Sequence, residues 1–285
     1  MSITSLGREQ QVQPGVQGER HEGQWLGRLR EMARRHLEIL LVPVAMVALL
    51  GGWHLVARLG DYPAYLLPLP RQVLERFVAV AGDGTLWYHT SITLVEIVGG
   101  LALGLAAATL LGYLLAKSPL VERFLSPYIV ASQSVPIVAL APLLIVWFGF
   151  GLLPKVLVCA LTIFFPVLIN TIVGLRSVEG DLMDLMRSLQ ASRWQIFRFL
   201  EMPAALPVFL GGLKVGVTLS VIGAVVGEFA QADRGLGFLV NLANRGLFDT
   251  PLMFVALFVL MTIALGLYGV VSALEALLLS WQRGG

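Results

Sequence analysis

The side chains that most often perform chemistry are few in this sequence and form no catalytic or metal-binding pattern. His21, His36, His54 and His89 are scattered, and no two are three or four residues apart, the spacing that places two metal ligands on one helix face. Cys159 is the only cysteine, so neither a disulfide nor a cysteine metal site is expected. We therefore expect no metal ligand and no catalytic residue.

Nucleotide binding within this chain is not expected either. The sequence Gly-x-x-x-x-Gly-Lys-[Ser/Thr], whose loop amides hold nucleotide phosphates, is absent from the 285 residues. The net charge of +2 does not indicate a nucleic-acid partner, because the arginines lie in short segments between apolar runs and not on a basic face.

Polar and aromatic side chains inside the apolar runs are the candidates for a solute path. Glu96 and Glu228 are the ionisable groups deepest in apolar sequence, where a charge indicates function or an internal partner. A lone serine in a helix more often bonds to its own backbone, whereas the Asn170 amide needs several partners. Aromatic residues more often pack or mark the membrane interface. The path candidates are Ser132, Ser134, Asn170, Trp147, Phe164 and Glu228.

The composition of the chain places these residues in a lipid bilayer. Hydrophobic residues make up 57% of the sequence and charged residues 13%, about half of the charged share of a soluble domain. A bilayer core of ~30 Å requires ~20 apolar residues per helix. The sequence predicts an all-α, polytopic membrane protein with about six spans, near residues 39–59, 91–116, 125–151, 152–175, 209–230 and 253–279.

Two of these spans have special features. The second is rich in glycine, including Gly100, Gly104 and Gly112, which lets helices approach closely in lipid. The third contains Pro127, Pro136 and Pro142, so it is either one kinked span or a short helix followed by a full one.

The distribution of lysine and arginine predicts that both termini are cytoplasmic, because positively charged segments stay inside. Residues 1–37 form a predicted cytoplasmic tail rich in arginine, and residues 38–281 form the predicted transmembrane domain, with a long cytoplasmic loop at 176–207. Fewer basic residues fall in the predicted outer loops, namely Arg71, Arg76, Lys155, Arg234 and Arg245.

The 176–207 loop has a helical pattern of its own. From residue 179 to residue 191, the apolar residues Leu182, Leu185, Met186 and Leu189 recur at helical spacing opposite a polar face. A second short helix is predicted to begin after Ser192, a favourable N-cap, and to end at the prolines of the 203–207 stretch.

The amino-acid sequence of this loop resembles the ATPase-docking loop of binding-protein-dependent ABC importer permeases. That loop reads Glu-Ala-Ala, three residues, Gly, nine residues, Ile, one residue, Leu-Pro, and DLMDLMRSLQASRWQIFRFLEMPAALP matches its spacing. Gln190 stands at the usual glycine and is expected to resist a left-handed turn. The docking residues implied by the resemblance are Asp181, Leu182, Asp184, Leu185, Met186, Leu189, Gln190, Ala191, Trp194, Phe197, Leu200 and Pro203.

Three further blocks resemble the branch of this family that imports sulfonates, taurine, nitrate, thiamine-precursor pyrimidines or riboflavin. They are SVPIVALAPLLIVWFGFG (134–151), FFPVLINTIVGL (164–175) and VGEFAQADRGLGFLV (226–240). The resemblance implies a type I importer permease fold in a bacterial inner membrane. It also implies a second, identical permease chain, an extracytoplasmic solute-binding protein, and separate ABC ATPase subunits that hold the ATP and magnesium.

The cargo is the least determined part of this interpretation. The segment NLANRGLFDTPLMFVALFVL (241–260) is more similar to permeases for thiamine-precursor pyrimidines or riboflavin, with sulfonate, taurine or nitrate as the alternative. A secondary transporter is the alternative class, and it would be expected to show inverted repeats and charged midplane residues. An intramembrane enzyme would need a paired catalytic constellation at span depth.

Overall fold

The computed structural model describes residue 41, residues 43–231 and residues 233–280, and it divides into two units, Met1–Asp61 and Tyr62–Gly285. The predicted cytoplasmic tail, residues 1–37, lies outside the described residues. In the first unit, the described part contains one apolar helix, Pro43–Leu59, at the position of the first predicted span.

The second unit is helical, and its described part contains no strand. Four of its helical segments are long and apolar enough to cross a membrane, and one bent helix pair also qualifies if it is a single span. Together with Pro43–Leu59, these segments correspond to the six predicted spans. The elements are α2 (Pro70–Gly82), α3 (Thr85–Lys117), α4 (Pro119–Gln133), α5 (Ile137–Phe148), α6 (Leu152–Arg176), α7 (Gly180–Ser188), α8 (Arg193–Ile196), the π-helix η1 (Phe197–Glu201), α9 (Met202–Gln231), α10 (Leu236–Leu242), the π-helix η2 (Ala243–Leu247) and α11 (Thr250–Leu278).

Small residues bring the central helices of this unit together. α6 packs against both α3 and α9. A Cβ on Gly104 of α3 would lie 2.7 Å from the carbonyl oxygen of Ala160 in α6, so only glycine permits this distance. α9 also approaches α6 closely, since a Cβ on Gly223 of α9 would lie 2.8 Å from the Cα of Cys159. The predicted close packing at the α3 glycines is confirmed.

The predicted third span consists of two helices. α4 and α5 meet at an angle of 95°, and the bend falls at Ser134–Pro136. Pro136 is the N-cap residue of α5 and has extended backbone angles, which a proline and the residue before it favour. Pro127 and Pro142 instead lie inside α4 and α5, respectively.

One predicted boundary is wrong. Proline was expected to end the second loop helix near residues 203–207, but α8, η1 and α9 form a continuous segment that passes through Pro203 and Pro207. At Pro203 the reason is the π-helical turn just before it, in which the Met202 amide donates to the Phe197 carbonyl oxygen five residues earlier. Because this turn is wider, the chain absorbs a proline ring and its missing N–H without terminating. Pro207 lies inside α9 itself.

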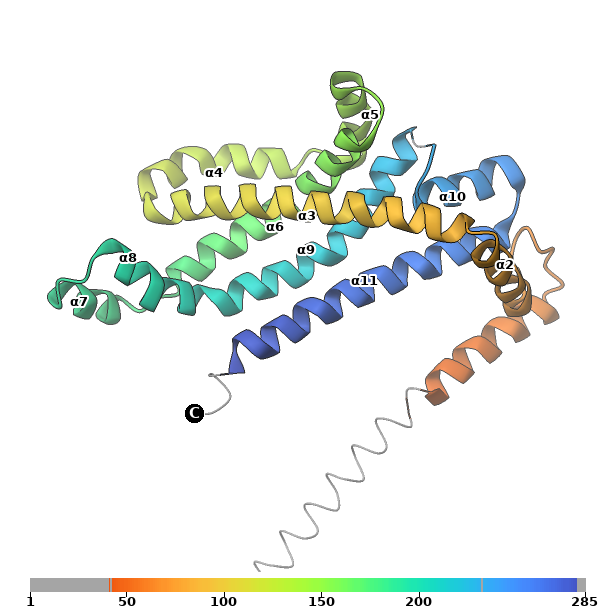
Figure 1. Cartoon of the computed structure of the whole chain (residues 1–285), viewed down its shortest axis with the longest axis horizontal. Helices are drawn as coiled ribbons and strands as arrows, with labels where there is room; N and C mark the ends of the chain where they lie inside the picture. Colours follow the sequence, from red (N-terminus) through yellow and green to blue (C-terminus); the bar gives the residue numbers. More distant parts are fainter. Residues whose placement is uncertain (1–40, 42, 232, 281–285) are drawn as a thin grey trace, which may run out of the picture. The chain divides into compact units, whose positions relative to one another are not determined.

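The two ends of the second unit differ in structure. Figure 1 shows α7 and α8 at one end and α10 and α2 at the other, with α3, α6, α9 and α11 running between them. We call these the α7 end and the α10 end. Many apolar side chains on the long helices are exposed, as expected for surfaces that contact lipid or another chain.

Candidate functional site

At the α7 end, the predicted amphipathic helix is present as α7. Asp181 lies in its first turn and Arg187 in its last, an arrangement that matches the charges of the helix dipole. Leu182, Leu185 and Leu189 are exposed. An apolar stripe left exposed on a short helix, outside the long spans, is a surface available to a partner protein.

Gln190 was expected to resist a left-handed turn, but the turn after α7 is left-handed and is made by this glutamine. Gln190 has a φ of 55°. The Gln190 amide donates to the Arg187 carbonyl oxygen (2.9 Å) and the Ala191 amide to the Met186 carbonyl oxygen (3.0 Å). These two bonds form a Schellman motif. The geometry expected from the usual glycine is therefore retained, at a steric cost of about 1 kcal/mol.

α8 begins as predicted. The Gln195 amide donates to Ser192 Oγ (3.3 Å), and the Ser192 amide donates to Gln195 Oε1 (2.7 Å), which is a capping box. Phe197, at the end of α8, makes an edge contact with Tyr113 of α3 and a tilted contact with Trp194. These aromatic contacts connect the loop to the membrane-spanning helices.

Two ion pairs at the α7 end connect the long helices to adjacent elements. Lys117, at the end of α3, forms an ion pair with Glu201 in η1, and Glu201 is only 3% exposed. Arg176, at the end of α6, donates to Glu122 of α4 with 2.8 Å between Nη1 and Oε1. Of the other predicted docking residues, Leu200 and Pro203 are half-buried, and Asp184 is exposed beside Arg187.

Small-molecule sites are typically cavities of about 300–1,000 Å³. A cavity of about 620 Å³ opens beside the α4–α5 bend. Its polar contributors include Ser132 and Gln133 at the end of α4 and Thr162 of α6, and Phe165 supplies an aromatic face. Ser132 and Thr162 each donate to the carbonyl oxygen four residues earlier, at 2.7 Å. We call this the bend cavity.

The structure does not bring the other predicted path residues into the bend cavity. Trp147 is exposed, and Phe164 packs on the buried cluster around Leu168. Asn170 donates to the Pro166 carbonyl oxygen (2.8 Å) and lies against α9, where a Cβ on Gly212 would come within 2.6 Å of Asn170 Cβ. Ser134 bonds to its own helix through the Val130 carbonyl oxygen.

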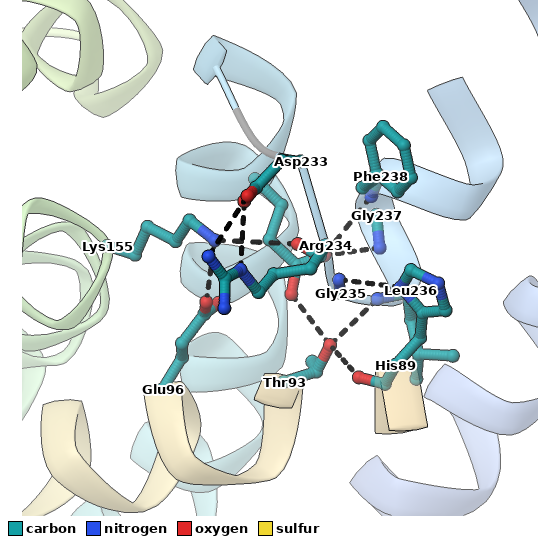
Figure 2. A network of polar contacts seen from close by, with 11 residues as sticks. His89, Thr93, Glu96, Lys155, Asp233, Arg234, Gly235, Leu236, Gly237 and Phe238 are labelled. Carbon is teal, nitrogen blue, oxygen red and sulfur yellow. Dashed lines mark hydrogen bonds and ion pairs between the residues drawn. The ribbon is translucent and has the colours of Figure 1, made fainter. Parts of the chain in front are cut away.

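The remaining candidate, Glu228, is buried near the end of α9 and belongs to a polar network at the α10 end. Figure 2 shows other members of this network, including Thr93, Gly235 and Gly237. Thr93 of α3 donates to Glu228 Oε1 at 2.6 Å. The backbone amides of Gly237 and Phe238 donate to Glu228 Oε2. The glycine-rich stretch after α9 therefore turns back onto α9.

Glu96 belongs to the same region, paired with a residue that the sequence interpretation misplaced. Lys155 was expected in an outer loop, but it lies in the first turn of α6, buried, and its Nζ is 2.9 Å from Glu96 Oε1. The first turn of a helix tolerates proline, so α6 begins before Pro154 and carries Lys155 inward. Lys155 also donates to the Arg234 carbonyl oxygen at 3.4 Å.

Two further network residues were not among the sequence candidates. His89 Nδ1 accepts from the Gly235 amide at 2.9 Å, and Thr93 Oγ1 accepts from the Leu236 amide at 2.8 Å. A glycine-rich stretch next to a buried carboxylate was the available signal, but partners more than a hundred residues away leave no local pattern. The described residues contain no group of three or more side chains suited to a metal ion.

A second cavity, of about 750 Å³, lies beside this network. Glu96 and Lys155 line it together with Asp233 and Arg234. Asp233 and Arg234 pair with each other at 3.0 Å and are exposed, and the hydrogen bond from Arg234 lowers the pKa of the Asp233 carboxyl. We call this the α10-end cavity.

Comparison with known proteins assigns the chain to a family. Residues 100–279 match the family described as "Binding-protein-dependent transport system inner membrane component". The riboflavin transport system permease protein RibX of Chloroflexus aurantiacus is 47% identical over 255 residues, which cover 90% of this chain and 95% of RibX. The formylaminopyrimidine transport permease protein ThiX of Halalkalibacterium halodurans is 36% identical, covering 88% and 99%. The taurine permease protein TauC of Escherichia coli is 35% identical, covering 83% and 88%.

Solved structures agree with this fold. A chain of the MetNI methionine ABC transporter, in an inward-facing conformation, matches with a TM-score of 0.57 at 18% identity, over 68% of this chain and 94% of that chain. In this family the permease is not catalytic, since ATP hydrolysis belongs to a separate subunit. This chain is therefore a binding-protein-dependent transport system inner membrane component, the multi-pass permease subunit of an ABC importer.

Proposed function

We propose that this permease imports riboflavin or a related flat heteroaromatic solute, such as a pyrimidine precursor of thiamine. The observation that carries the proposal is the 47% identity to the riboflavin permease RibX over nearly the whole of both chains. The formylaminopyrimidine permease ThiX, at 36%, supports the same solute class. Taurine and aliphatic sulfonate permeases, at 35% and 31%, support the alternative cargo.

The α7 end faces the cytoplasm in this proposal, and both termini are cytoplasmic. Arg176, Arg187, Arg193 and Arg198 all lie at this end, and clustered basic residues favour the cytoplasmic side. The exposed stripe of α7 then meets the ABC ATPase. ATP and magnesium bind to that partner, while a second copy of this chain completes the permease and a solute-binding protein delivers the cargo at the α10 end.

Docking can be tested by substitution on the exposed stripe of α7. Leu185→Glu places a charge in the proposed contact without touching the membrane-spanning core, since Leu185 is exposed. Arg71→Glu on α2 is the matched control, an exposed charge change at the α10 end. We expect the ATPase to co-purify with the wild type and the control but not with Leu185→Glu. Retention by Leu185→Glu would contradict docking through α7.

The bend cavity is the proposed contact site for the cargo. Phe165 provides a face for a flat ring, and Gln133 and Ser132 provide polar groups at its edge. Phe165→Leu keeps the apolar volume but removes the aromatic face. We expect it to lower the uptake of riboflavin several-fold while the amount of assembled complex is unchanged, and we expect Phe148→Leu, at an exposed position on α5, to have little effect.

Cargo is tested by reconstitution. Proteoliposomes that contain the permease, its ATPase and its binding protein should take up radiolabelled riboflavin in the presence of ATP. Excess formylaminopyrimidine or taurine, added separately, identifies the preferred class by competition. Taurine uptake without riboflavin uptake would favour the alternative cargo. Uptake without any ATPase would overturn the importer mechanism in favour of a secondary transporter.

A further inference from the structure

We propose that Glu228 is a positioning residue that holds the 233–238 loop as the gate at the α10 end of the permease. The proposal rests on the orientation given under the proposed function, in which this end faces outward. In this proposal the buried Glu228 carboxylate keeps the loop closed while the α7 end is open. Glu228 does not contact the cargo in this account.

The first argument is the geometry around the Glu228 carboxylate. The side chain is 1% exposed, and both oxygens accept hydrogen bonds from the protein, one from Thr93 and the other from the Gly237 and Phe238 amides. A carboxylate that accepts backbone amides in a buried site fixes the position of the peptide that carries them. Figure 2 shows Thr93 and the loop residues Gly235, Leu236, Gly237 and Phe238 gathered around this network, with the bonds drawn as dashed lines.

The sequence of the loop matches this role. Gly235 has a φ of 111°, a conformation that side chains rarely adopt. A Cβ on Gly237 would come within 2.7 Å of Glu228 Oε2 and 3.1 Å of Glu228 Cβ. The two glycines therefore allow the backbone to lie directly against the carboxylate, which larger residues at these positions would prevent.

The second argument is that the loop is bonded to three membrane-spanning helices at once. His89 and Thr93 of α3 accept from its Gly235 and Leu236 amides, Lys155 of α6 donates to its Arg234 carbonyl oxygen, and Glu228 belongs to α9. Lys155 also pairs with Glu96, which joins α6 to α3. Any separation of these helices at the α10 end must break or shift bonds to the loop.

The third argument is the position of the loop beside a cavity. Asp233 and Arg234 line the α10-end cavity of about 750 Å³ together with the buried Glu96 and Lys155. Because loop residues form part of the cavity wall, a change in the loop changes access to the space next to the helices. A segment so placed, fixed by bonds that alternative helix positions would break, has the properties of a gate.

The gate can be tested by the labelling of one cysteine. Leu236 lies in this loop and is fully buried, so Leu236→Cys, in a Cys159→Ala background, is expected to react with a maleimide only when the loop moves away from the helices. The complex with its ATPase and binding protein is placed in right-side-out membrane vesicles, and a membrane-impermeant maleimide is added outside. We expect slow labelling without nucleotide and faster labelling when ATP is trapped.

Glu228→Gln keeps one oxygen that can accept from the loop amides but removes the negative charge that strengthens these bonds, and its NH2 group cannot accept from Thr93. In this variant we expect the maleimide to label Leu236→Cys about tenfold faster without nucleotide. We also expect the labelling rate to lose its dependence on nucleotide. Thr93→Val is a second, milder variant that should change labelling in the same direction. Glu275→Gln is the matched control, because it removes a carboxylate paired with Lys214 and not bonded to the loop. This control should label like the wild type.

The outcomes separate this proposal from the orientation on which it rests. Asp233→Cys, at an exposed position, should label from outside in every state. If Asp233→Cys and Leu236→Cys label only in inside-out vesicles, the proposed orientation fails, whereas an effect of Glu228→Gln there still supports the positioning role. Equal labelling of Leu236→Cys in wild type and Glu228→Gln, or a lower thermal stability of Glu228→Gln with unchanged labelling, would overturn the gate.

Discussion

Lys155 of α6 and Glu96 of α3 form an ion pair that is almost fully removed from solvent, with side chains 7% and 0% exposed and 2.9 Å between Nζ and Oε1. Thr93, which bonds to Glu228, lies one helical turn from Glu96 on α3. The region therefore holds two buried carboxyl groups and one buried ammonium. Because of this imbalance, the members of the network are not expected to contribute equally to the stability of the folded permease.

Removing the ammonium is expected to cost more than removing one carboxylate charge. Lys155→Met leaves Glu96 and Glu228 without a buried counter-cation, so we expect a loss of about 3–5 kcal/mol in stability. Glu96→Gln leaves one carboxyl and one ammonium, and we expect a loss of less than about half of that. Thermal unfolding of the purified permease in one detergent measures both. A larger loss for Glu96→Gln than for Lys155→Met would contradict this order.

The ion pair at the opposite end predicts a smaller effect. Lys117→Met leaves the Glu201 carboxylate buried without its cation, but the Lys117 side chain is 43% exposed, so water can partly replace it. We expect a loss of about 2 kcal/mol. Arg187→Ala, which removes the exposed pair with Asp184, should cost about 0.5 kcal/mol or less and is the control. Unfolding temperatures of the two variants should differ by several degrees.

Gln190→Gly is expected to stabilise the turn after α7. Glycine adopts the left-handed conformation without the steric cost of glutamine, which raises the stability of the folded state by about 1 kcal/mol. The larger conformational entropy that glycine loses on folding reduces this gain. Gln190→Val, with a β-branched side chain, should destabilise it. Because the Schellman geometry is unchanged, Gln190→Gly should still co-purify with the ATPase. Loss of the ATPase by Gln190→Gly would show that the glutamine side chain itself makes the contact.

The α3–α6 contact predicts a strong difference between two glycines. Gly104→Ala would place a Cβ 2.7 Å from both the Ala160 carbonyl oxygen and an Ile163 side-chain carbon, so the helices must move apart. We expect a loss of about 1–3 kcal/mol. Gly266→Ala in α11 has nothing within 4 Å of the added Cβ and should be neutral or slightly stabilising. Equal unfolding temperatures for the two variants would contradict the packing argument.

The sequence was a good guide to the spans and to the α7 helix, because both depend on local apolar patterns. It could not decide the α4–α5 bend, since Pro127, Pro136 and Pro142 look alike in sequence and only Pro136 falls at the break. It counted Lys155 among the outer-loop cations although the predicted span began at residue 152, because the partner Glu96 lies on another helix and leaves no local pattern. Partners such as Thr93 and Glu228, far apart in the chain, follow only from helix packing.

The unbroken segment from Arg193 to Ala230 is 38 residues long, which corresponds to a rod of about 57 Å at 1.5 Å per residue. A rod of that length exceeds the ~30 Å hydrocarbon core, so it reaches from the neighbourhood of α7 to the last turn before residue 231. Tilting it by about 5° displaces one tip by about 5 Å relative to the other. A small rotation of the helix near Trp194 thus displaces its other end, near Glu228, by more than the length of a hydrogen bond.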